Sequence, residues 1–263
     1  MRTDYDRLAH RYDDEAIRQR GPDPHWLELC QVRGRPDGEG LCALDVGCGT
    51  GIQLVANLGA TPRAKLVGLN LHQAMLDVAR QKSAAIDWVQ GDAAALPFES
   101  ASFDYVSAQN CFHHVERKFE MLEQILRVLR PGGRFTLLNL DPWKSLDWEI
   151  YRYFPEASEL DQRDFWKEEQ LLREFERVGF VIEGVLPKHI RTDHDLGERL
   201  SFYRQRYSPS HLVALSDAAF AAGIARIEAE LSAHRGGPVR VQGQLCLVTI
   251  VASRPLPVDP TIS

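Results

Sequence analysis

The stretch with the clearest chemical meaning is Leu41–Gly51, which reads LCALDVGCGTG. A short apolar run ends at Val46, and Gly47, Gly49 and Gly51 follow it directly. This order predicts a strand, a tight turn and the start of a helix. Alternating glycines let a ligand approach the backbone and permit positive φ angles, and a helix N-terminus presents unpaired N–H groups. The turn is therefore a candidate site for a polar ligand.

The glycine spacing and a neighbouring carboxylate narrow the class of ligand. A dinucleotide turn reads GxGxxG, whereas the glycines here follow GxGxG, and Asp45 precedes the first of them by two positions. A carboxylate repels a pyrophosphate, but it accepts hydrogen bonds from an ammonium group. The pattern favours a zwitterionic ligand, with a nicotinamide-dependent oxidoreductase as the less favoured alternative.

Polar residues occur where the next two predicted strands end. Asn70 ends a strand predicted over 65–70, and Asp92 follows one predicted over 86–90. Ligands of open α/β sheets bind beyond the carboxyl ends of the strands, so both side chains are expected to line the same site. A fourth strand is predicted over 103–108, and the loop after it contains adjacent histidines.

Further motifs give these residues a family context. The strings GDA, ALPF and SFDYV follow the glycine turn in order, and LRPGGRF leads into a fifth predicted strand. With 44–51 they resemble the landmarks of the class I S-adenosylmethionine-dependent methyltransferases, in their small-molecule, ubiquinone/menaquinone-methyltransferase-like branch. The resemblance covers 44–138 at motif level and 41–252 at fold level. It implies S-adenosylmethionine as the cofactor and methyl transfer as the reaction.

The resemblance also implies which residues form the site. Expected cofactor contacts are Tyr12, Asp45, Gly47, Cys48, Gly49, Gly51, Asn70, Leu71, Met75, Asp92, Ala93, Gln109 and Asn110. Tyr12 belongs to a YxxxAxxYD pattern that resembles an N-terminal lid. His113 and His114 should face the transferable methyl group, where neutral imidazole can act as a general base, and packing at the next helix start is the alternative.

Asn70 departs from the family, which usually has an acidic residue where the cofactor's ribose binds. An amide still reaches a hydroxyl, but it loses the charge-assisted part of the hydrogen bond, on the order of 1 kcal/mol. A catalytically silent S-adenosylmethionine-binding protein is therefore the second alternative.

The substrate is expected to bind after the fifth strand, because 141–166 holds a large share of the aromatic residues. Trp143, Trp148 and Tyr151 are the candidate substrate-binding residues, and an acceptor that is aromatic or carries a carboxylate is expected. The alternative is that these rings form the apolar underside of a lid.

The elements that position these residues alternate between strand and helix and predict an α/β fold with a doubly wound sheet. The family resemblance implies that this sheet is Rossmann-like and seven-stranded and ends in an antiparallel hairpin, with a helical cap inserted before the last strand. The expected division is an N-terminal helical lid at 1–40, a methyltransferase core at 41–186 plus 244–254, a substrate-covering cap at 187–243 and a tail at 255–263. Helices are expected over 4–16 and 209–234, and the last two strands over 179–186 and 244–252.

Composition excludes some classes of partner. The formal net charge is -6, and no basic run or long apolar run is present, which argues against nucleic acid and membrane partners. The five cysteines form no CxxC pair and are expected to be reduced core residues of a cytoplasmic protein, with no metal site. The expected partner is a small-molecule substrate, and a homodimer is left open.

Overall fold

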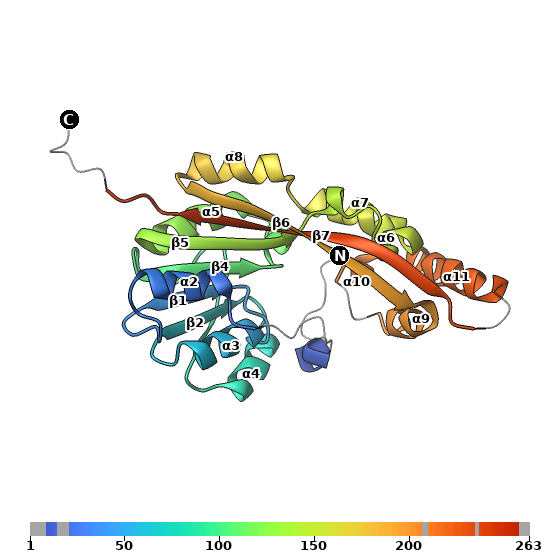
Figure 1. Cartoon of the computed structure of the whole chain (residues 1–263), viewed down its shortest axis with the longest axis horizontal. Coiled ribbons are helices and arrows are strands. Elements are labelled where there is room, and N and C mark those ends of the chain that lie inside the picture. The colour runs from blue at the N-terminus through green and yellow to red at the C-terminus, as the bar shows by residue number, and fades with distance from the viewer. Residues whose placement is uncertain (1–8, 15–20, 207–209, 235–236, 258–263) are drawn as a thin grey trace. The chain divides into compact units, whose positions relative to one another are not determined.

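The computed structural model describes residues 9–14, 21–206, 210–234 and 237–257, and its seven-stranded sheet has the order β3-β2-β1-β4-β5-β7-β6 (Figure 1). The strands are β1 Cys42–Val46, β2 Lys65–Asn70, β3 Asp87–Gln90, β4 Phe103–Gln109, β5 Leu129–Leu140, β6 Val181–Asp195 and β7 Arg240–Ser253. This order confirms the predicted Rossmann-like α/β class.

Strands β1 to β5 are parallel, since β1 pairs with β2 and β4, β2 pairs with β3, and β4 pairs with β5. Strand β7 is antiparallel to β5: the Gly132 N–H donates to the Arg254 carbonyl, and the Asp141 N–H donates to the Cys246 carbonyl, each at 2.8 Å. The carboxyl ends of β1, β2, β3 and β4 therefore lie at one edge, where the predicted site residues were expected.

The chain forms two compact units. The sheet unit comprises the described residues of Tyr5–Asn139, Glu169–Leu186 and Thr249–Ser263, and the helical unit those of Leu140–Glu168 and Pro187–Val248. Helices of the sheet unit are η1 Ala9–Asp14, α2 Pro24–Val32, α3 Ile52–Ala60, α4 Gln73–Lys82, η3 Phe112–His114, α5 Lys118–Val128 and most of α8 Glu168–Val178. The helical unit contains η4 Pro142–Lys144, α6 Glu149–Tyr153, α7 Pro155–Asp164, α9 Leu196–Arg204, α10 Ser210–Ala214 and α11 Asp217–Ala233.

In the sheet unit, buried polar contacts fix α2 to the sheet and to α3. The fully buried Trp26 donates from Nε1 to Thr61 Oγ1 at 2.9 Å. The Tyr105 hydroxyl of β4 donates to the Asp23 carboxylate at 2.7 Å, and the other oxygen of that carboxylate caps α2 by accepting from the His25 N–H. Burial raises the pKa of Tyr105 well above its ordinary value, so this hydroxyl keeps its proton and stays a donor.

The helical unit has its own apolar core, built from α6, α7, α9, α10 and α11. Gly223 of α11 lies so close to Phe154 that a Cβ added there would be 2.0 Å from the ring, so only glycine allows this approach. The predicted single helix over 209–234 is wrong: it is interrupted between α10 and α11. Ser216 causes the restart, because its hydroxyl accepts from the Ala219 N–H at 3.2 Å as an N-cap.

Other boundaries also differ from those expected. Strand β6 continues to Asp195 and β7 begins at Arg240, so both are longer than predicted and the helices between them occupy 196–233. Of the helix predicted over 4–16, the described residues 9–14 form a 3-10 helix, and the remainder lies outside the described residues. The division into lid, core, cap and tail stays a prediction.

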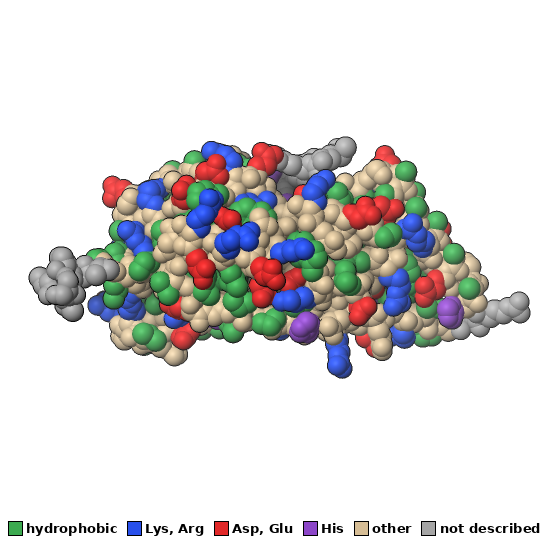
Figure 2. All heavy atoms as spheres, turned by 90° about the horizontal axis from the view of Figure 1, so that it is seen from above, with side chains coloured by type: hydrophobic (Ala, Val, Ile, Leu, Met, Phe, Trp, Pro, Cys, Tyr) green, Lys and Arg blue, Asp and Glu red, His purple; other side chains and the backbone are tan. Residues whose placement is uncertain are grey.

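The surface carries both signs of charge. Figure 2 shows lysine and arginine side chains interspersed with aspartate and glutamate over the face that it draws. Among the described residues, no helix combines the length and the apolar character needed to cross a lipid bilayer.

Candidate functional site

The turn between β1 and α3 is built on glycines in the left-handed region, with φ of 75° at Gly47, 56° at Gly49 and 79° at Gly51. Packing explains the first and the last. A Cβ on Gly47 would lie 2.5 Å from the Cys111 side chain, and one on Gly51 would lie 2.3 Å from the Trp88 ring. The chain's own packing therefore requires glycine at 47 and 51.

Gly49 differs, because among the described residues a Cβ there would meet only a Tyr12 ring carbon, at the ordinary contact distance of 3.8 Å. The open side of the turn is thus at Gly49. Gly51 is the N-cap residue of α3 and has no side chain to cap it, so the N-cap residue leaves the first N–H groups of α3 to other partners, such as a ligand or water. The space at Gly49 and these donors fit a polar ligand at the turn.

Asp45, the penultimate residue of β1, supplies negative charge below the turn. It is 3% exposed, and its Oδ1 accepts from the Ser107 hydroxyl of β4 at 2.7 Å. Burial and then the Asp45 charge raise the pKa values of the Cys48 and Cys111 thiols above their ordinary value. Both cysteines are therefore thiols at neutral pH and are no nucleophiles. The Cys48 side chain packs in the core, so only its backbone lines the turn.

Asn70 connects the turn to the end of β2. Its Oδ1 accepts from the Gly49 N–H at 3.4 Å, and its Nδ2 donates to the His72 carbonyl at 3.2 Å, with 9% of the residue exposed. Leu71, which follows it, is 53% exposed beside the turn, whereas Met75 is buried with 1% exposed. The amide thus lies where a ligand at Gly49 would meet it.

Asp92 follows β3, as expected, and is held at both oxygens. Oδ1 accepts from the Ala94 N–H at 2.8 Å, and Oδ2 accepts from Arg117 at 2.7 Å. Ala93 lies between Asp92 and Ala94 in sequence. Sequence reasoning missed Arg117; its place directly after the histidine pair and a glutamate, at the N-cap of α5, is the only signal for it.

The end of β4 returns tightly to the turn. Gln109 is the last residue of β4 rather than part of a loop, and Asn110 has a positive φ of 52° while its N–H donates to the Leu138 carbonyl at 2.8 Å. His113 and His114 lie on the short η3 with ring centroids 3.9 Å apart; His113 is half-buried and His114 is exposed.

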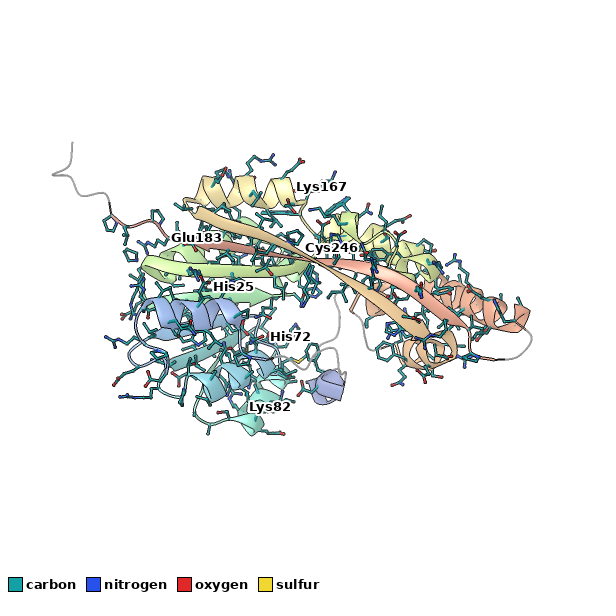
Figure 3. All side chains as sticks on the ribbon, in the orientation of Figure 1. His25, His72, Lys82, Lys167, Glu183 and Cys246 are labelled. Atoms are coloured by element: carbon teal, nitrogen blue, oxygen red, sulfur yellow. The ribbon has the colours of Figure 1, made fainter. Side chains whose placement is uncertain are left out.

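Three further residues hold η1 at the turn. The Asp13 carboxylate accepts from the Thr50 hydroxyl at 2.5 Å and pairs with Lys82 at 2.5 Å, and Lys82 also donates to the Thr50 carbonyl at 2.7 Å. Figure 3 shows Lys82 and His72 at opposite ends of α4. Sequence reasoning included Tyr12 and Asp13 in the lid pattern but did not predict these contacts, since nothing local connects positions 13, 50 and 82.

Asn139 is a buried amide at this sheet edge that could accept a further hydrogen bond. Asn139, near the end of β5, is 2% exposed, and among the described residues its Oδ1 has no hydrogen-bond partner. Burying such an atom costs about 1–3 kcal/mol. Asn139 is therefore a further candidate for binding a ligand or a water molecule, and no sequence pattern indicated it.

The three predicted substrate-binding residues belong to the helical unit. Tyr151 is 6% exposed, and its hydroxyl donates to the Asp161 carboxylate at 2.7 Å. Trp148 packs edge-on against it, with ring centroids 5.4 Å apart. Trp143 is half-buried, with the Lys167 ammonium 5.6 Å from its ring. Trp143 and Trp148 are thus half-buried and Tyr151 is buried, and contact of any of the three with substrate stays a prediction.

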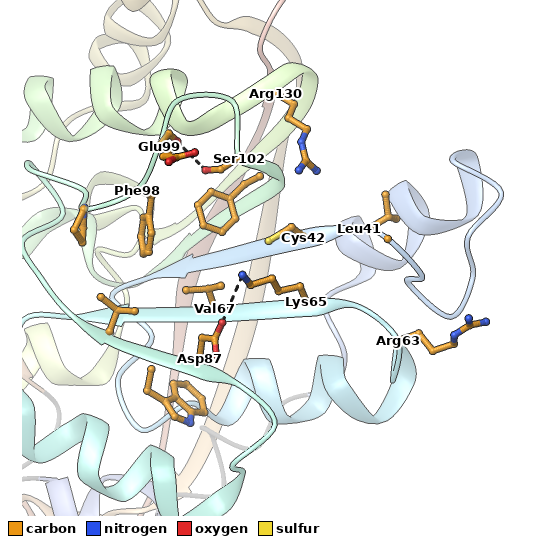
Figure 4. Close-up of a pocket in the computed structure, with 15 residues that line it drawn as sticks. Leu41, Cys42, Arg63, Lys65, Val67, Asp87, Phe98, Glu99, Ser102 and Arg130 are labelled. Atoms are coloured by element: carbon orange, nitrogen blue, oxygen red, sulfur yellow. Dashed lines mark hydrogen bonds and ion pairs between the residues drawn. The ribbon is translucent and has the colours of Figure 1, made fainter.

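A separate cavity of 850 Å³ opens at the amino ends of the strands, the edge opposite the glycine turn (Figure 4). Val67, Phe98 and Phe103 form part of its apolar wall. Its cations have acidic partners, in the pairs Arg63–Asp37, Lys65–Asp87 and Arg130–Asp104. Because these charges are paired, the cavity offers little attraction for an anion.

Comparisons with known proteins agree with this geometry. A family model described as a methyltransferase domain matches residues 44–137. The chain is 32% identical over 166 residues to the demethylmenaquinone methyltransferase of Staphylococcus aureus. This alignment covers 54% of this chain and 69% of the relative. It is 41% identical over 100 residues to the biotin biosynthesis bifunctional protein BioHC of Cellvibrio japonicus, covering 38% of this chain.

Coverage of other relatives is partial. The matched part spans 20% of the Cellvibrio protein and 57% of the ubiquinone/menaquinone biosynthesis C-methyltransferase UbiE of Desulfotalea psychrophila. Among solved structures, the MccD protein superposes with a TM-score of 0.59 at 16% identity, covering 88% of this chain and 95% of that one, which shows a shared fold.

The sheet order and the glycine turn define a Rossmann-like protein with a candidate ligand site at the carboxyl edge of its strands. With the matched domain and relatives, the chain belongs to the class I S-adenosylmethionine-dependent methyltransferases. Membership implies S-adenosylmethionine as the cofactor, and it removes the basis for the nicotinamide alternative.

Proposed function

We propose that this protein transfers the methyl group of S-adenosylmethionine to a small molecule that is aromatic or carries a carboxylate, with an aromatic acceptor favoured. The observation that carries the proposal is the turn at Gly49, where the described residues leave room beside the backbone and the preceding strand β1 places a buried carboxylate, Asp45. This combination suits a ligand with an ammonium group.

The residues of the turn would hold the cofactor in distinct ways. The Asp45 carboxylate, oriented by Ser107, would attract the ammonium group, and the N–H groups at the start of α3 would face the carboxylate of the same amino acid moiety. Asn70 would turn its amide from the long 3.4 Å contact with Gly49 toward a ribose hydroxyl. When bound, S-adenosylmethionine supplies an electrophilic methyl group. The chain then needs to align the acceptor and exclude water.

The favoured acceptor class follows from two observations. The Staphylococcus relative is named a demethylmenaquinone methyltransferase, and this name gives a quinone as its acceptor. The helical unit carries a partly accessible ring at Trp143, with Lys167 near its face. A planar, electron-rich acceptor matches such a surface.

A labelled-methyl assay tests the proposal. Purified protein is incubated with methyl-labelled S-adenosylmethionine and a panel of reduced naphthoquinones, phenols, indoles and aromatic carboxylates. We expect label in at least one product with equal release of S-adenosylhomocysteine. The Asp45→Ala variant should lose micromolar cofactor binding by calorimetry, whereas Asp87→Ala, an exposed carboxylate at the amino end of β3, should keep it.

Two outcomes of this assay contradict the proposal in different ways. Cofactor binding without label transfer to any acceptor would support the catalytically silent alternative, for which the engaged amide of Asn70 is the structural argument. Absence of binding at millimolar cofactor would exclude a working cofactor site altogether.

The histidine pair on η3 allows a specific prediction. If the acceptor arrives protonated and one histidine is its general base, His113→Ala or His114→Ala should lower turnover by about 10²- to 10⁴-fold near neutral pH. S-adenosylhomocysteine release at saturating cofactor measures this, with His25→Ala on α2 as the control. Turnover that is unchanged in both variants would rule out a base role for the pair.

A further inference from the structure

Asp13, Thr50 and Lys82 form a closed ring of contacts between three elements. Asp13 belongs to η1, Thr50 to the glycine turn, and Lys82 is the last residue of α4. Thr50 donates its hydroxyl to Asp13 Oδ1 at 2.5 Å, Lys82 Nζ lies 2.5 Å from Asp13 Oδ2, and the same Nζ donates to the Thr50 carbonyl at 2.7 Å. Each residue contacts both others.

Burial distinguishes this ring from an ordinary surface ion pair. Thr50 is 1% exposed, and the Lys82 and Asp13 side chains are 26% and 33% exposed. Charge-assisted hydrogen bonds that are partly removed from water are stronger than exposed pairs. Because about a third of the Asp13 side chain and a quarter of the Lys82 side chain remain exposed, high salt can still weaken this pair. Lys82 also lies at the negative end of the α4 dipole, which favours its charge.

The contacts among Asp13, Thr50 and Lys82 fix the position of Tyr12. Tyr12 immediately precedes Asp13, and among the described residues its ring is the nearest group to Gly49, at 3.8 Å from a Cβ position there. The contacts of Asp13 therefore hold an aromatic ring beside Gly49. The Tyr12 ring therefore lies close to where S-adenosylmethionine would enter or leave the proposed site at Gly49.

We infer that Lys82 is a positioning residue that fastens η1 over the cofactor site through Asp13 and Thr50, and so sets how long the cofactor stays bound. The inference rests on the proposed cofactor site at Gly49. Lys82 acts through Asp13 and needs no contact with the cofactor itself.

The test compares dissociation of S-adenosylhomocysteine from the full chain by stopped-flow displacement. We expect Lys82→Met and Asp13→Asn each to raise the dissociation rate about tenfold, with Lys82→Arg retaining most of the wild-type rate. The double variant should be no faster than the faster single variant, because both remove one coupled contact. Lys65→Met is the control. The Lys65 side chain is 67% exposed, and its ammonium group lies 3.8 Å from the carboxylate of Asp87 on β3.

Salt gives a second readout that a general loss of stability would not move. Raising sodium chloride from about 0.05 M to about 0.5 M should speed dissociation from the wild-type protein and have little effect on Lys82→Met. Equal rates in the wild type, Lys82→Met and Asp13→Asn would overturn the inference. Effects of the two substitutions that simply add would do the same.

A cofactor-free measurement separates this inference from the proposed function. Millisecond hydrogen exchange at residues 9–14 should be faster in Lys82→Met than in the wild type, and unchanged in Lys65→Met. If the wild type bound no cofactor, the proposed function would fail, and so would the proposed control of how long the cofactor stays bound. Faster hydrogen exchange at residues 9–14 in Lys82→Met would still establish that Lys82 holds η1 in place. Unchanged exchange in Lys82→Met would show that Lys82 does not hold η1.

Discussion

Gly49→Ala should weaken S-adenosylhomocysteine binding at least about tenfold, which corresponds to roughly 1.4 kcal/mol or more, while the protein remains folded. The added methyl group would project from the turn toward Tyr12, whose ring carbon at 3.8 Å is the nearest atom in the part of the chain that the structure describes. Its cost to folding is that of an alanine at a φ of 56°, about 1–2 kcal/mol, or several degrees in Tm. Calorimetric titration and thermal denaturation measure the two effects.

Gly51→Ala provides the matched comparison, because the same change occurs two residues later with a different surrounding. A Cβ at this position would lie 2.3 Å from a Trp88 ring carbon and 3.2 Å from the Ala79 side chain. Overpacking adds about 1–3 kcal/mol to the cost of the positive φ, so the loss of stability should clearly exceed that of Gly49→Ala. Equal losses of binding and stability in the two variants would mean that Gly49, like Gly51, serves only the fold.

The glycine turn illustrates what local sequence can predict. A strand, a turn and a helix that follow one another within a dozen residues are specified by their own residues, so Asp45, Gly49 and Asn70 were expected at one edge and occur there. Because these strands are parallel, their carboxyl ends lie at the same edge of the sheet, so the location of the site follows from the sheet order and not from any single contact. The restart of α11 was missed, although Ser216 is an N-cap residue type directly before the apolar repeat and could have indicated it.

Contacts between distant positions could not be predicted in the same way. Lys82 meets Asp13 only because α4 and η1 both pack beside the turn, and the sequence around Lys82 reads as an ordinary basic helix end. Likewise Tyr151 gave an aromatic signal, but the partner that occupies its hydroxyl, Asp161, follows from how α6 packs against α7. Residue type indicated an aromatic region there, and only tertiary structure distinguishes core rings from accessible ones.

Arg199→Met should destabilise the helical unit by about 3–5 kcal/mol, because it removes the main charge partner of a buried carboxylate. Glu149 of α6 is fully buried; its Oε1 lies 3.2 Å from Arg199, and its Oε2 accepts from the Thr192 hydroxyl at 2.8 Å. The polypeptide is fitted closely around it, since a Cβ on Gly243 would lie 2.8 Å from the same Oε2. Urea denaturation of the full chain measures the loss.

A rescue variant identifies the cause of this loss. Adding Glu149→Gln to Arg199→Met removes the uncompensated charge and keeps an acceptor for Thr192, so more than half of the lost stability should return. If the double variant is no more stable than Arg199→Met, the cause is instead the packing of the arginine against the Phe202 and Tyr203 rings, 5.1 Å and 4.9 Å away.

The same pair controls a titration at His194, which lies 3.7 Å from Glu149 Oε1. Burial and then the Arg199 charge lower the pKa of His194 below its ordinary value of 6.5, with Arg240 acting in the same direction and Glu149 and Asp193 opposing them. The unfolded chain then binds a proton more readily than the folded one, so the wild type should lose stability as pH falls through about 6.5. In Arg199→Met the chief repelling charge is gone and the carboxylate is uncompensated, so the pKa of His194 rises and this loss shrinks. The difference in urea midpoint between the two proteins should therefore narrow from about pH 7.5 to about pH 5.5, and a constant difference would show that His194 does not sense the pair.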